Sequence, residues 1–502
     1  MLKVLFVLKS VEYIDPMGIM LLSSLAKQAG HHTYLHVLSD GEMVDTLERV
    51  RPDVVAFSAK TGEHKYYLEA NRAVKAFDKG IVTIMGGPHT TFFPGTIDHH
   101  DLDAICVGEG DDAWPEFLNA LARGGDIHGI PNIQTKLNRA EDRILPLRPK
   151  KADLDRLPYL DRDLVYRSTR LRRFPMRSYM AGRGCPYPCT YCFNHAFRAV
   201  YRGKGRLYNR FSVERIVAEL KVLKAKYETQ FIKFYDDIFV FRYDEWLEEF
   251  AEKYPREIGL PFHCLVRADL LTEPMLLALK NAGIHSISMS IEAGNDETRN
   301  KLLKRNMSKE QITAAFDLCH KHKVPTFCNT ILAMPGTGIK EDIESLDLNV
   351  RCRVTFGEFP VFHPYPGTEL GRYTVEHGYF DGDYDRLHMS YQNESPLTCF
   401  SKKEKLMQKN LSLLGTVCLW QPWLRGITVK WLIRLPLTGL YFLAYYLVKA
   451  YLIKTKIYPL RLSPTNILKG IYESLSLERF KHSDEKVRST DRRELAPTRT
   501  RR

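Results

Sequence analysis

Residues 183–194 read RGCPYPCTYCFN and place Cys185, Cys189 and Cys192 within one short segment. Three thiolates this close in sequence can hold three irons of a four-iron cluster. The fourth iron then stays open to a ligand that is not a protein side chain. A cluster needs such an open iron if it is to react with a bound molecule. The spacing therefore predicts a catalytic iron–sulfur site.

Two other interpretations of these cysteines exist. A zinc site normally takes four ligands, usually as two pairs, and His195 lies three residues after Cys192 as a candidate fourth ligand. That reading would make the chain a non-catalytic, zinc-stabilised binding protein. A disulfide framework is disfavoured, because ten cysteines in 502 residues are too sparse for a densely bridged scaffold.

Predicted strands and helices alternate after the cysteine segment. Helix-length stretches such as 212–227 and 309–322 separate short apolar runs, and the runs lie at 231–237, 261–267, 286–294, 326–331 and 356–362. This alternation predicts a parallel sheet of the barrel type. Functional groups in such barrels gather at the carboxyl ends of the strands. Asp236, Asp237, Arg267 and Glu292 end the first three of these runs.

The C-x3-C-x2-C spacing, with the aromatic Tyr191 before the last cysteine, resembles the signature of the radical S-adenosylmethionine (radical SAM) enzymes. The resemblance implies a partial (β/α)6 TIM-type barrel and a [4Fe-4S] cluster on Cys185, Cys189 and Cys192. SAM would chelate the open iron through its amino and carboxylate groups. A flavodoxin- or ferredoxin-type electron donor is implied as a partner.

The same resemblance implies a set of residues that contact SAM. Tyr191 belongs to the motif, Asp236 and Asp237 would accept hydrogen bonds from the SAM ammonium, and Arg267 would pair with its carboxylate. Glu292 would bind the ribose hydroxyls or the amino group. Each of the four charged residues is equally compatible with a structural ion pair or a solvated loop.

The first 140 residues show a separate α/β pattern. Apolar runs at 2–8, 53–58 and 81–85 alternate with helical periodicity at 17–29 and 66–77, which predicts an independent doubly wound, Rossmann-like sheet. The loops 13–18, 85–89 and 107–110 resemble those of the cobalamin-binding domain of cobalamin-dependent radical SAM enzymes. The residues that this resemblance assigns to cobalamin are Tyr13, Gly18, Gly86, Gly87, His89, Gly108, Glu109 and Gly110.

One departure from cobalamin domains concerns the ligand below cobalt. The Asp-x-His-x-x-Gly motif is absent, because the loop 9–18 contains no histidine, and the nearest match at 98–103 lacks the glycine and comes too late. The expected lower face therefore has no histidine from that motif. An ordinary nucleotide-binding or substrate-docking fold is the alternative. Cys106 is the only cysteine of this region, which argues against a second cluster of the methylthiotransferase kind.

The remaining sequence completes the expected domain organisation. A linker rich in Arg, Asp and Pro follows the first domain, and the barrel is followed by helical and polar stretches. The predicted divisions are 1–140 for the cobalamin-binding domain, 141–175 for the linker, 176–370 for the barrel, 371–475 for a helical, basic region and 476–502 for a disordered tail.

The helical region contains an uncharged stretch, 435–448, flanked by cations and near three tryptophans. It is shorter than a membrane span requires, so a helix in the membrane interface or one packed on the barrel is expected. The net charge of +13 fits membrane or acidic-substrate contact, and no nucleic-acid motif accompanies it. No signal peptide is visible, so the expected location is cytoplasmic, with peripheral attachment to the inner face of the membrane as an option.

The resemblance also implies an activity. One SAM would methylate cob(I)alamin, and another would yield a 5'-deoxyadenosyl radical that activates an unactivated carbon for methyl transfer. The expected substrate is a hydrophobic or lipid-linked small molecule. A radical SAM cyclase or rearrangement enzyme without methyl transfer is the alternative. His363 and Tyr365 are expected to face substrate or to pack, and no further catalytic residue is assigned. The other cysteines after the motif, which are Cys264, Cys319, Cys328, Cys352, Cys399 and Cys418, are expected to fill the core.

Overall fold

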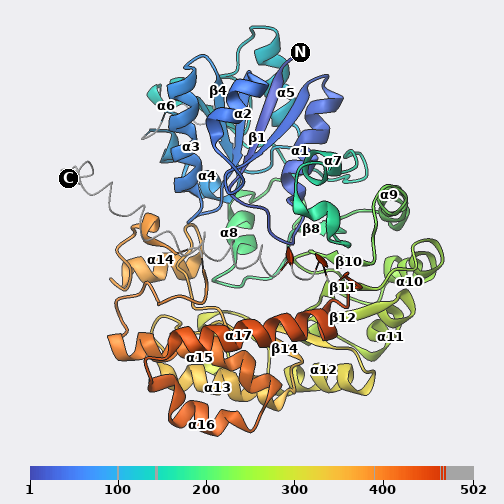
Figure 1. Cartoon of the computed structure of the whole chain (residues 1–502), viewed down its shortest axis with the longest axis vertical. Coiled ribbons are helices and arrows are strands. Elements are labelled where there is room, and N and C mark those ends of the chain that lie inside the picture. The colour runs from blue at the N-terminus through green and yellow to red at the C-terminus, as the bar shows by residue number, and fades with distance from the viewer. Residues whose placement is uncertain (99–100, 142–144, 389, 464, 467–468, 471–502) are drawn as a thin grey trace.

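The structure is a computed structural model, and it describes residues 1–98, 101–141, 145–388, 390–463, 465–466 and 469–470. The tail expected at 476–502 lies outside the described residues. Figure 1 shows the N-terminal sheet with its helices above a second α/β unit, and the C-terminal helices α15 to α17 below and in front of that unit.

The first sheet is doubly wound, as predicted. Its order is β2-β1-β3-β4-β5-β6, with only β6 antiparallel to its neighbour. The strands are β1 (Lys3–Leu8), β2 (His32–Val37), β3 (Val54–Ser58), β4 (Val82–Gly86), β5 (Ala104–Cys106) and β6 (Ile133–Thr135). The connecting helices are α1 (Met17–Gln28), α2 (Met43–Val50), α3 (His64–Phe77), α4 (Pro88–Phe92), α5 (Ala113–Ala122) and α6 (Lys136–Ala140).

The apolar run of β1 explains why helices cover both faces of this sheet. Successive strand side chains point to opposite faces, so an uninterrupted apolar strand needs a cover on each side. Val4 and Phe6 belong to the same hydrophobic cluster as residues of α1 and α5. Leu5 and Val7 belong to a second cluster, with residues of α2 and α3. The carboxyl ends of the strands are left for loops.

The second sheet has six strands in the order β14-β13-β12-β11-β10-β7, and all of its pairings are parallel. The strands are β7 (Met176–Tyr179), β10 (Phe231–Phe234), β11 (Phe262–Leu265), β12 (Ile284–Ser288), β13 (Thr326–Asn329) and β14 (Phe356–Glu358). Its helices are α9 (Val213–Lys226), α10 (Glu245–Glu257), α11 (Glu273–Ala282), α12 (Lys309–Lys321) and α13 (Ile339–Arg351). The partial six-stranded barrel expected from the sequence is confirmed.

The segment between the sheets is more structured than an extended connector. It contains α7 (Arg162–Tyr166) and a 3-10 turn at Arg170–Arg173. Arg162 is buried and bonds to Asp15 in the loop after β1, with 2.7 Å between Nη1 and Oδ2. Charged and polar residues that look like a solvated linker in the sequence therefore join the two sheets in a buried contact.

The C-terminal helices close one end of the barrel. They are α15 (Lys402–Trp420), α16 (Leu424–Lys430) and α17 (Thr438–Leu452), whereas α14 (Glu369–Glu376) lies beside the cysteine loop, where the N–H of Leu370 donates a hydrogen bond to the carbonyl of Thr190. Thr416 of α15 donates a hydrogen bond of 2.6 Å to the carbonyl of Gly357 in β14. Val448 and Leu452 of α17 join Phe231 at the start of β10 in one apolar cluster. No helix within the described ranges is long and apolar enough to cross a membrane.

The cysteines outside the motif follow the expectation with one exception. Five of the six assigned to the core are buried, but Cys399 is exposed. The filler interpretation is therefore wrong for Cys399, which lies just before the N-terminus of α15. Cysteine spacing alone carries no information about burial, and a small polarisable side chain is tolerated in either place.

Candidate active site

The cysteine loop lies between the short strand β8 (Gly182–Arg183) and α8 (Phe193–Val200). Gly184 has a φ of +93°, and a Cβ on it would lie 2.3 Å from the carbonyl oxygen of Leu207, so only glycine fits there. Figure 1 shows α8 between the N-terminal unit and the barrel. The sequence thus places all three thiols where the two units meet.

Asp236 and Asp237, just after β10, fasten this loop. Asp236 accepts hydrogen bonds from the backbone N–H groups of Ala181 (3.1 Å) and Gly182 (2.6 Å). Asp237 accepts one from the N–H of Gly184 at 3.2 Å. Burial raises the pKa of Asp236 to about 8 and also raises the pKa of Asp237. The carboxylates predicted to meet the SAM ammonium thus lie at the base of the cysteine loop.

The three thiols sit in a desolvated environment. Cys189 is buried, while Cys185 and Cys192 are partly exposed. Burial raises the pKa of Cys192 to about 12 and raises the pKa of Cys185 as well. Because thiolates and not thiols bind metal, cluster binding must displace these protons. The loop therefore favours neutral thiols until iron arrives.

Two arginines flank Cys189, and only one of them was predicted. The Nη1 atoms of Arg267 and Arg305 each lie 3.9 Å from the Cys189 sulfur. Arg267 also makes a bidentate bond to Asp269, at 3.0 and 2.9 Å, and stacks on the ring of Tyr187. Arg267 therefore already has a carboxylate partner in the protein. Two guanidinium groups beside one sulfur favour the negative charge of a thiolate-bound cluster.

Glu292 and Tyr191 meet next to these arginines. The Tyr191 hydroxyl donates a hydrogen bond of 2.9 Å to Glu292, and Arg305 lies 3.4 Å from the same hydroxyl. Burial raises the pKa of Glu292, and the charge of Arg305 opposes that rise. Glu292 has a φ of +62°, a strained conformation for a side chain of this kind. Two predicted SAM residues, Tyr191 and Glu292, are thus brought together with Arg305.

His195, the alternative fourth zinc ligand, has other partners. Its Nδ1 lies 3.0 Å from Arg198, and its Nε2 lies 3.7 Å from a carboxylate oxygen of Glu369. Within the described part of the chain, no three His, Cys, Asp or Glu side chains converge as ligands of a single metal ion. His195 is thus engaged by side chains outside the cysteine motif.

The loops assigned to cobalamin lie at the carboxyl edge of the first sheet. The strand order reverses between β1 and β3, and ligands of open α/β sheets bind outside the strands at such a point. Gly18 borders this edge, and a Cβ added to it would meet nothing within 4 Å. Tyr13 of the same loop donates a hydrogen bond of 3.0 Å to the carbonyl of Gly470.

The other predicted cobalamin residues are held by the protein itself. Gly86 ends β4, Gly87 precedes α4, and Gly110 follows the loop of Gly108 and Glu109. A Cβ on Gly108 would lie 2.2 Å from the hydroxyl oxygen of Tyr201, so a protein contact already requires this glycine. Burial raises the pKa of Glu109.

His89, also assigned to cobalamin, is buried with both ring nitrogens engaged. Nδ1 lies 3.2 Å from the hydroxyl of Thr61, and Nε2 lies 3.1 Å from that of Thr96. Its ring stacks on His64 at 3.8 Å, and His64 in turn contacts Asp385 at 2.6 Å. These contacts tie both imidazoles to the protein. They fit a cobalamin site whose lower face takes no histidine.

The cysteine segment directly contacts the N-terminal loops. The N–H of Glu109 donates a hydrogen bond of 2.7 Å to the hydroxyl of Tyr201 at the end of α8. Arg183 pairs with Asp111 at 2.5 Å. The structure therefore brings the cysteine segment against the loop at 107–110, whereas Tyr13 lies in the separate loop after β1 and Gly18 lies in the first turn of α1.

Sequence reasoning missed several residues of this site. Arg305 lies in the loop after β12 and not at a strand end, so no positional rule singles it out. Arg183 is separated from the first cysteine of the motif by one glycine. A cation so close to the three thiols could have been recognised in the sequence as a candidate site residue. Asp111 and Tyr201 gave no signal, because their pairing depends on how the two sheets meet.

Two family models match the chain over these same two regions. The model of the radical SAM superfamily matches residues 179–348, and the model of the B12 binding domain matches residues 4–118. The chain belongs to the cobalamin-dependent radical SAM enzymes. The cofactors of this enzyme are a [4Fe-4S] cluster, SAM and cobalamin. The three-thiol loop flanked by arginines fits the cluster, and the open edge beside Gly18 fits cobalamin.

Distant relatives share this organisation. An uncharacterised methyltransferase of Pyrococcus horikoshii is 23% identical over 370 residues, which cover 72% of this chain and 78% of that protein. Hopanoid C-3 methylase of Methylococcus capsulatus is 27% identical over 310 residues, or 58% of this chain and 56% of that one. The cobalamin-dependent SAM radical enzyme OxsB, solved with aqua-cobalamin and SAM bound, has a TM-score of 0.66 at 15% identity and covers 99% of this chain and 82% of its own. The likeness to OxsB shows a shared fold.

Proposed function

We propose that this enzyme methylates an unactivated carbon of a hydrophobic or lipid-linked substrate. The observation that carries the proposal is the contact between the cysteine segment and the N-terminal loop, where Glu109 bonds to Tyr201 and Arg183 pairs with Asp111. A cofactor at the edge of the first sheet then lies beside the barrel mouth. When bound, the cluster and cobalamin supply SAM cleavage and a methyl carrier.

We assign the binding roles to the residues that meet at this site. Cys185, Cys189 and Cys192 would hold the cluster, and Glu292, oriented by the hydroxyl of Tyr191, would accept a hydrogen bond from SAM. Arg267 is the assigned partner of the SAM carboxylate, in competition with Asp269. Asp236 and Asp237 would affect SAM binding indirectly, because their hydrogen bonds hold the cysteine loop in place.

The cobalamin roles are assigned to the loops at the carboxyl edge of the first sheet. Tyr13 and Gly18 would line the open side of the cofactor, and the loops of Gly86, Gly87, Gly108, Glu109 and Gly110 would form the side next to the barrel. His89 would shape the site without binding cobalt, because its two ring nitrogens are already bonded to threonine hydroxyls.

The barrel interior supports a substrate with a polar portion. Lys233 of β10 lies 2.7 Å from the hydroxyl of Tyr235, and burial lowers the pKa of Lys233 to about 7. Lys449 pairs with Glu358 at 2.6 Å nearby. A lipid-linked or otherwise amphipathic molecule offers polar atoms that can also bond to these paired groups, and a purely apolar molecule does not. One relative is itself named a hopanoid methylase.

The proposed setting of the reaction is the cytoplasmic side of a membrane. A flavodoxin- or ferredoxin-type protein would deliver the electron that SAM cleavage requires. The stretch from Lys405 to Tyr472, which is basic and contains no Asp or Glu, supports a membrane location.

Product analysis distinguishes methyl transfer from the cyclase-type alternative without knowledge of the substrate. We expect anaerobically reconstituted enzyme, given cobalamin, SAM and a reductant, to form both 5'-deoxyadenosine and S-adenosylhomocysteine. Omitting cobalamin should remove S-adenosylhomocysteine and spare 5'-deoxyadenosine, because only the methyl transfer passes through the corrin. Chromatography with mass detection measures both products. Deoxyadenosine alone, in samples shown to contain cobalamin, would instead favour cyclisation or rearrangement.

A further inference from the structure

Helix α17 has one buried side and an opposite side that is apolar and exposed. Tyr441, Tyr445, Val448 and Leu452 are buried against the rest of the protein. The opposite side carries Leu440, Leu443, Leu447 and Tyr451, which are all exposed. A helix on the surface of a soluble domain normally turns polar residues outward. The outer side of α17 therefore lacks the side chains that water favours.

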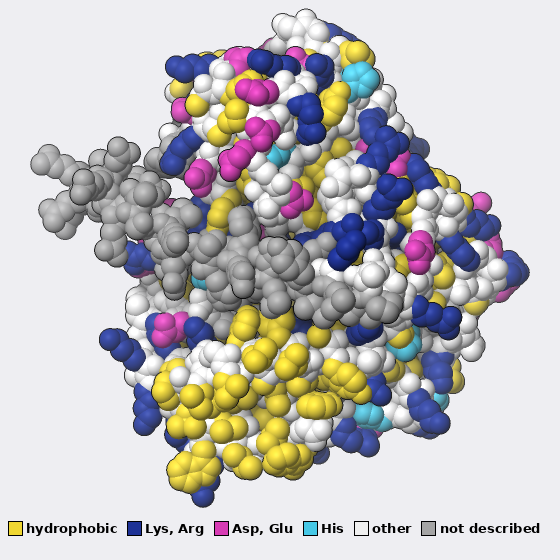
Figure 2. Space-filling model, in the orientation of Figure 1, with side chains coloured by type: hydrophobic (Ala, Val, Ile, Leu, Met, Phe, Trp, Pro, Cys, Tyr) yellow, Lys and Arg dark blue, Asp and Glu magenta, His cyan; other side chains and the backbone are white. Residues whose placement is uncertain are grey.

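The neighbouring segment extends this surface. Trp423, Ile427 and Trp431 recur every four residues along α16, so they share one side of that helix. Leu435 and Leu437 connect them to α17. We call these nine residues the apolar face: Trp423, Ile427, Trp431, Leu435, Leu437, Leu440, Leu443, Leu447 and Tyr451, each between 41% and 68% exposed. Figure 2 shows hydrophobic side chains gathered over this part of the molecule.

Charge is distributed unevenly around the apolar face. From Lys405 to Tyr472 the sequence contains no Asp or Glu. Lys430 and Arg434 lie beside Trp431, and Lys454 and Lys456 follow Tyr451, so exposed cations border both ends of the face. Among the residues that the structure describes, no carboxylate forms an ion pair with any of these four cations. A partner of the face must therefore tolerate or neutralise positive charge.

Two possible covers, the stretch after Phe480 and a second copy of the chain, fit poorly. After Phe480 the sequence has Val487 and Leu495 as its only large aliphatic side chains, so this stretch is too polar to cover an apolar surface. Gly470, which leads toward it, lies against Tyr13 of the N-terminal unit. A second copy of the chain would bring the bordering cations close to their own equivalents, with no acidic residue nearby in sequence to pair with them.

We propose that the apolar face binds the surface of an anionic lipid bilayer. The aliphatic side chains would enter the acyl boundary, and the tryptophans would lie at the headgroup level, where indoles are favoured. Lys430, Arg434, Lys454 and Lys456 would contact the lipid phosphates. The helix would lie in the interface and would not cross it, consistent with its length. This inference does not depend on the reaction that the enzyme catalyses.

Vesicle flotation with the reconstituted full-length enzyme measures this binding. We expect the protein to float with vesicles of equal parts POPC and POPG, and to bind pure POPC vesicles or high-salt samples more weakly. The triple variant Trp423→Ser, Trp431→Ser and Leu447→Ser should weaken vesicle binding at least about a hundredfold. Each large apolar side chain contributes strongly to the binding free energy when it is buried in the bilayer. Retained binding by this variant would contradict the proposal.

The matched control removes as many exposed apolar side chains from other helices. Val44→Ser, Val222→Ser and Leu277→Ser alter α2, α9 and α11, and should leave flotation unchanged. An equal loss of vesicle binding in both triple variants would overturn the assignment of the apolar face as the membrane-binding surface. Quenching of wild-type tryptophan fluorescence by brominated lipid needs no variant, and three of the five tryptophans are Trp420, Trp423 and Trp431. Absence of quenching, or concentration-dependent dimers without vesicle binding, would also refute it.

Failure of this inference and failure of the proposed function are separable. Vesicle binding requires neither SAM nor reductant, and the product analysis requires no membrane. An enzyme that forms S-adenosylhomocysteine but ignores anionic vesicles would contradict only the membrane inference. One that binds vesicles but transfers no methyl group would contradict only the proposed reaction.

Discussion

Replacing Cys189 with alanine should abolish formation of 5'-deoxyadenosine. Cys189 is the buried member of the three thiols and the one beside both Arg267 and Arg305. Changes to outer-shell partners alone typically cost 10–100-fold in metal affinity or activity, so loss of a ligand should reduce the product by more than about a hundredfold. The same variant should lose most of the iron and the visible absorption of the cluster after anaerobic reconstitution.

Cys399→Ala is the matched control for that experiment. Cys399 is exposed and distant in sequence from the motif, so its removal should leave iron content and product formation intact. A Cys189→Ala protein that still makes 5'-deoxyadenosine at the wild-type rate would refute the assignment of this loop as the cluster site.

Replacing Asp15 with alanine should destabilise the metal-free protein by about 3–5 kcal/mol, the usual cost of leaving a buried charge without its partner. Asp15 accepts hydrogen bonds from Arg162 (2.7 Å), from the hydroxyl of Tyr166 (2.8 Å) and from the N–H of Ser178 (2.7 Å). The side chains of Asp15 and Arg162 are only 1% and 5% exposed. Urea unfolding followed by circular dichroism measures the change.

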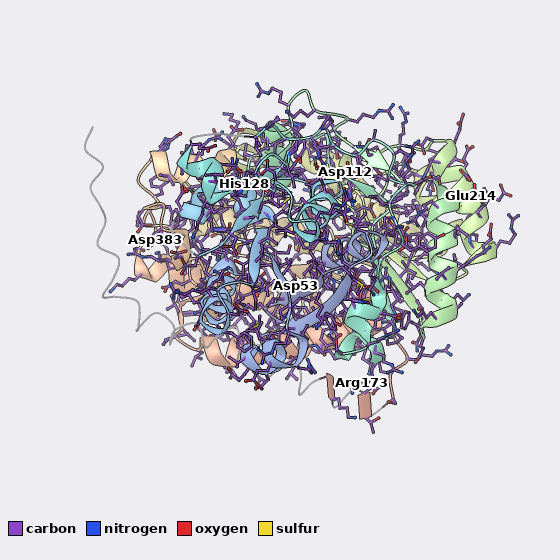
Figure 3. All side chains as sticks on the ribbon, turned by 90° about the horizontal axis from the view of Figure 1, so that it is seen from above. Asp53, Asp112, His128, Arg173, Glu214 and Asp383 are labelled. Carbon is purple, nitrogen blue, oxygen red and sulfur yellow. The ribbon has the colours of Figure 1, made fainter. Side chains whose placement is uncertain are left out.

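A surface ion pair provides the comparison. Asp112 pairs with Lys151 at 2.5 Å, but its side chain is 49% exposed, so Asp112→Ala should cost no more than about 1 kcal/mol. Figure 3, which looks down on the N-terminal sheet, labels Asp112 and also shows Glu214 and Asp383 at opposite edges of the molecule. The double variant Asp15→Ala, Arg162→Met should recover part of the lost stability, because it removes the stranded cation. Equal effects of Asp15→Ala and Asp112→Ala would show that the buried contact is unimportant.

Local sequence patterns predicted the architecture well. The run from Val4 to Leu8 is apolar without interruption, which indicates a strand covered on both faces, and β1 has that environment. The strands that end near Asp236 and Glu292 were found in the same way. The loop of Cys185, Cys189 and Cys192 needed only spacing, because a cluster motif is local in sequence.

Contacts between distant segments were beyond local patterns. Arg305 reaches Cys189 across 116 residues of sequence, and Asp15 reaches Arg162 across 147. Burial of these groups depends on how the two sheets dock, which composition does not encode. The stretch 435–448 illustrates the same limit, because packing on the barrel holds for one side of α17 and the membrane interpretation of the other side stays a prediction. Its inner side packs on the barrel and its outer side is exposed.

Electron–nuclear double resonance of the reduced cluster most directly examines whether three thiolates leave one iron open for SAM. The sample is the anaerobically reconstituted enzyme with SAM carrying ¹⁵N at its amino group. We predict a ¹⁵N hyperfine coupling between that nitrogen and the cluster, which a ¹⁴N pattern replaces when unlabelled SAM is used. A reconstituted cluster that shows no such coupling with SAM bound would contradict the claim that one iron is open for SAM. A zinc ion held by the same cysteines would contradict it as well.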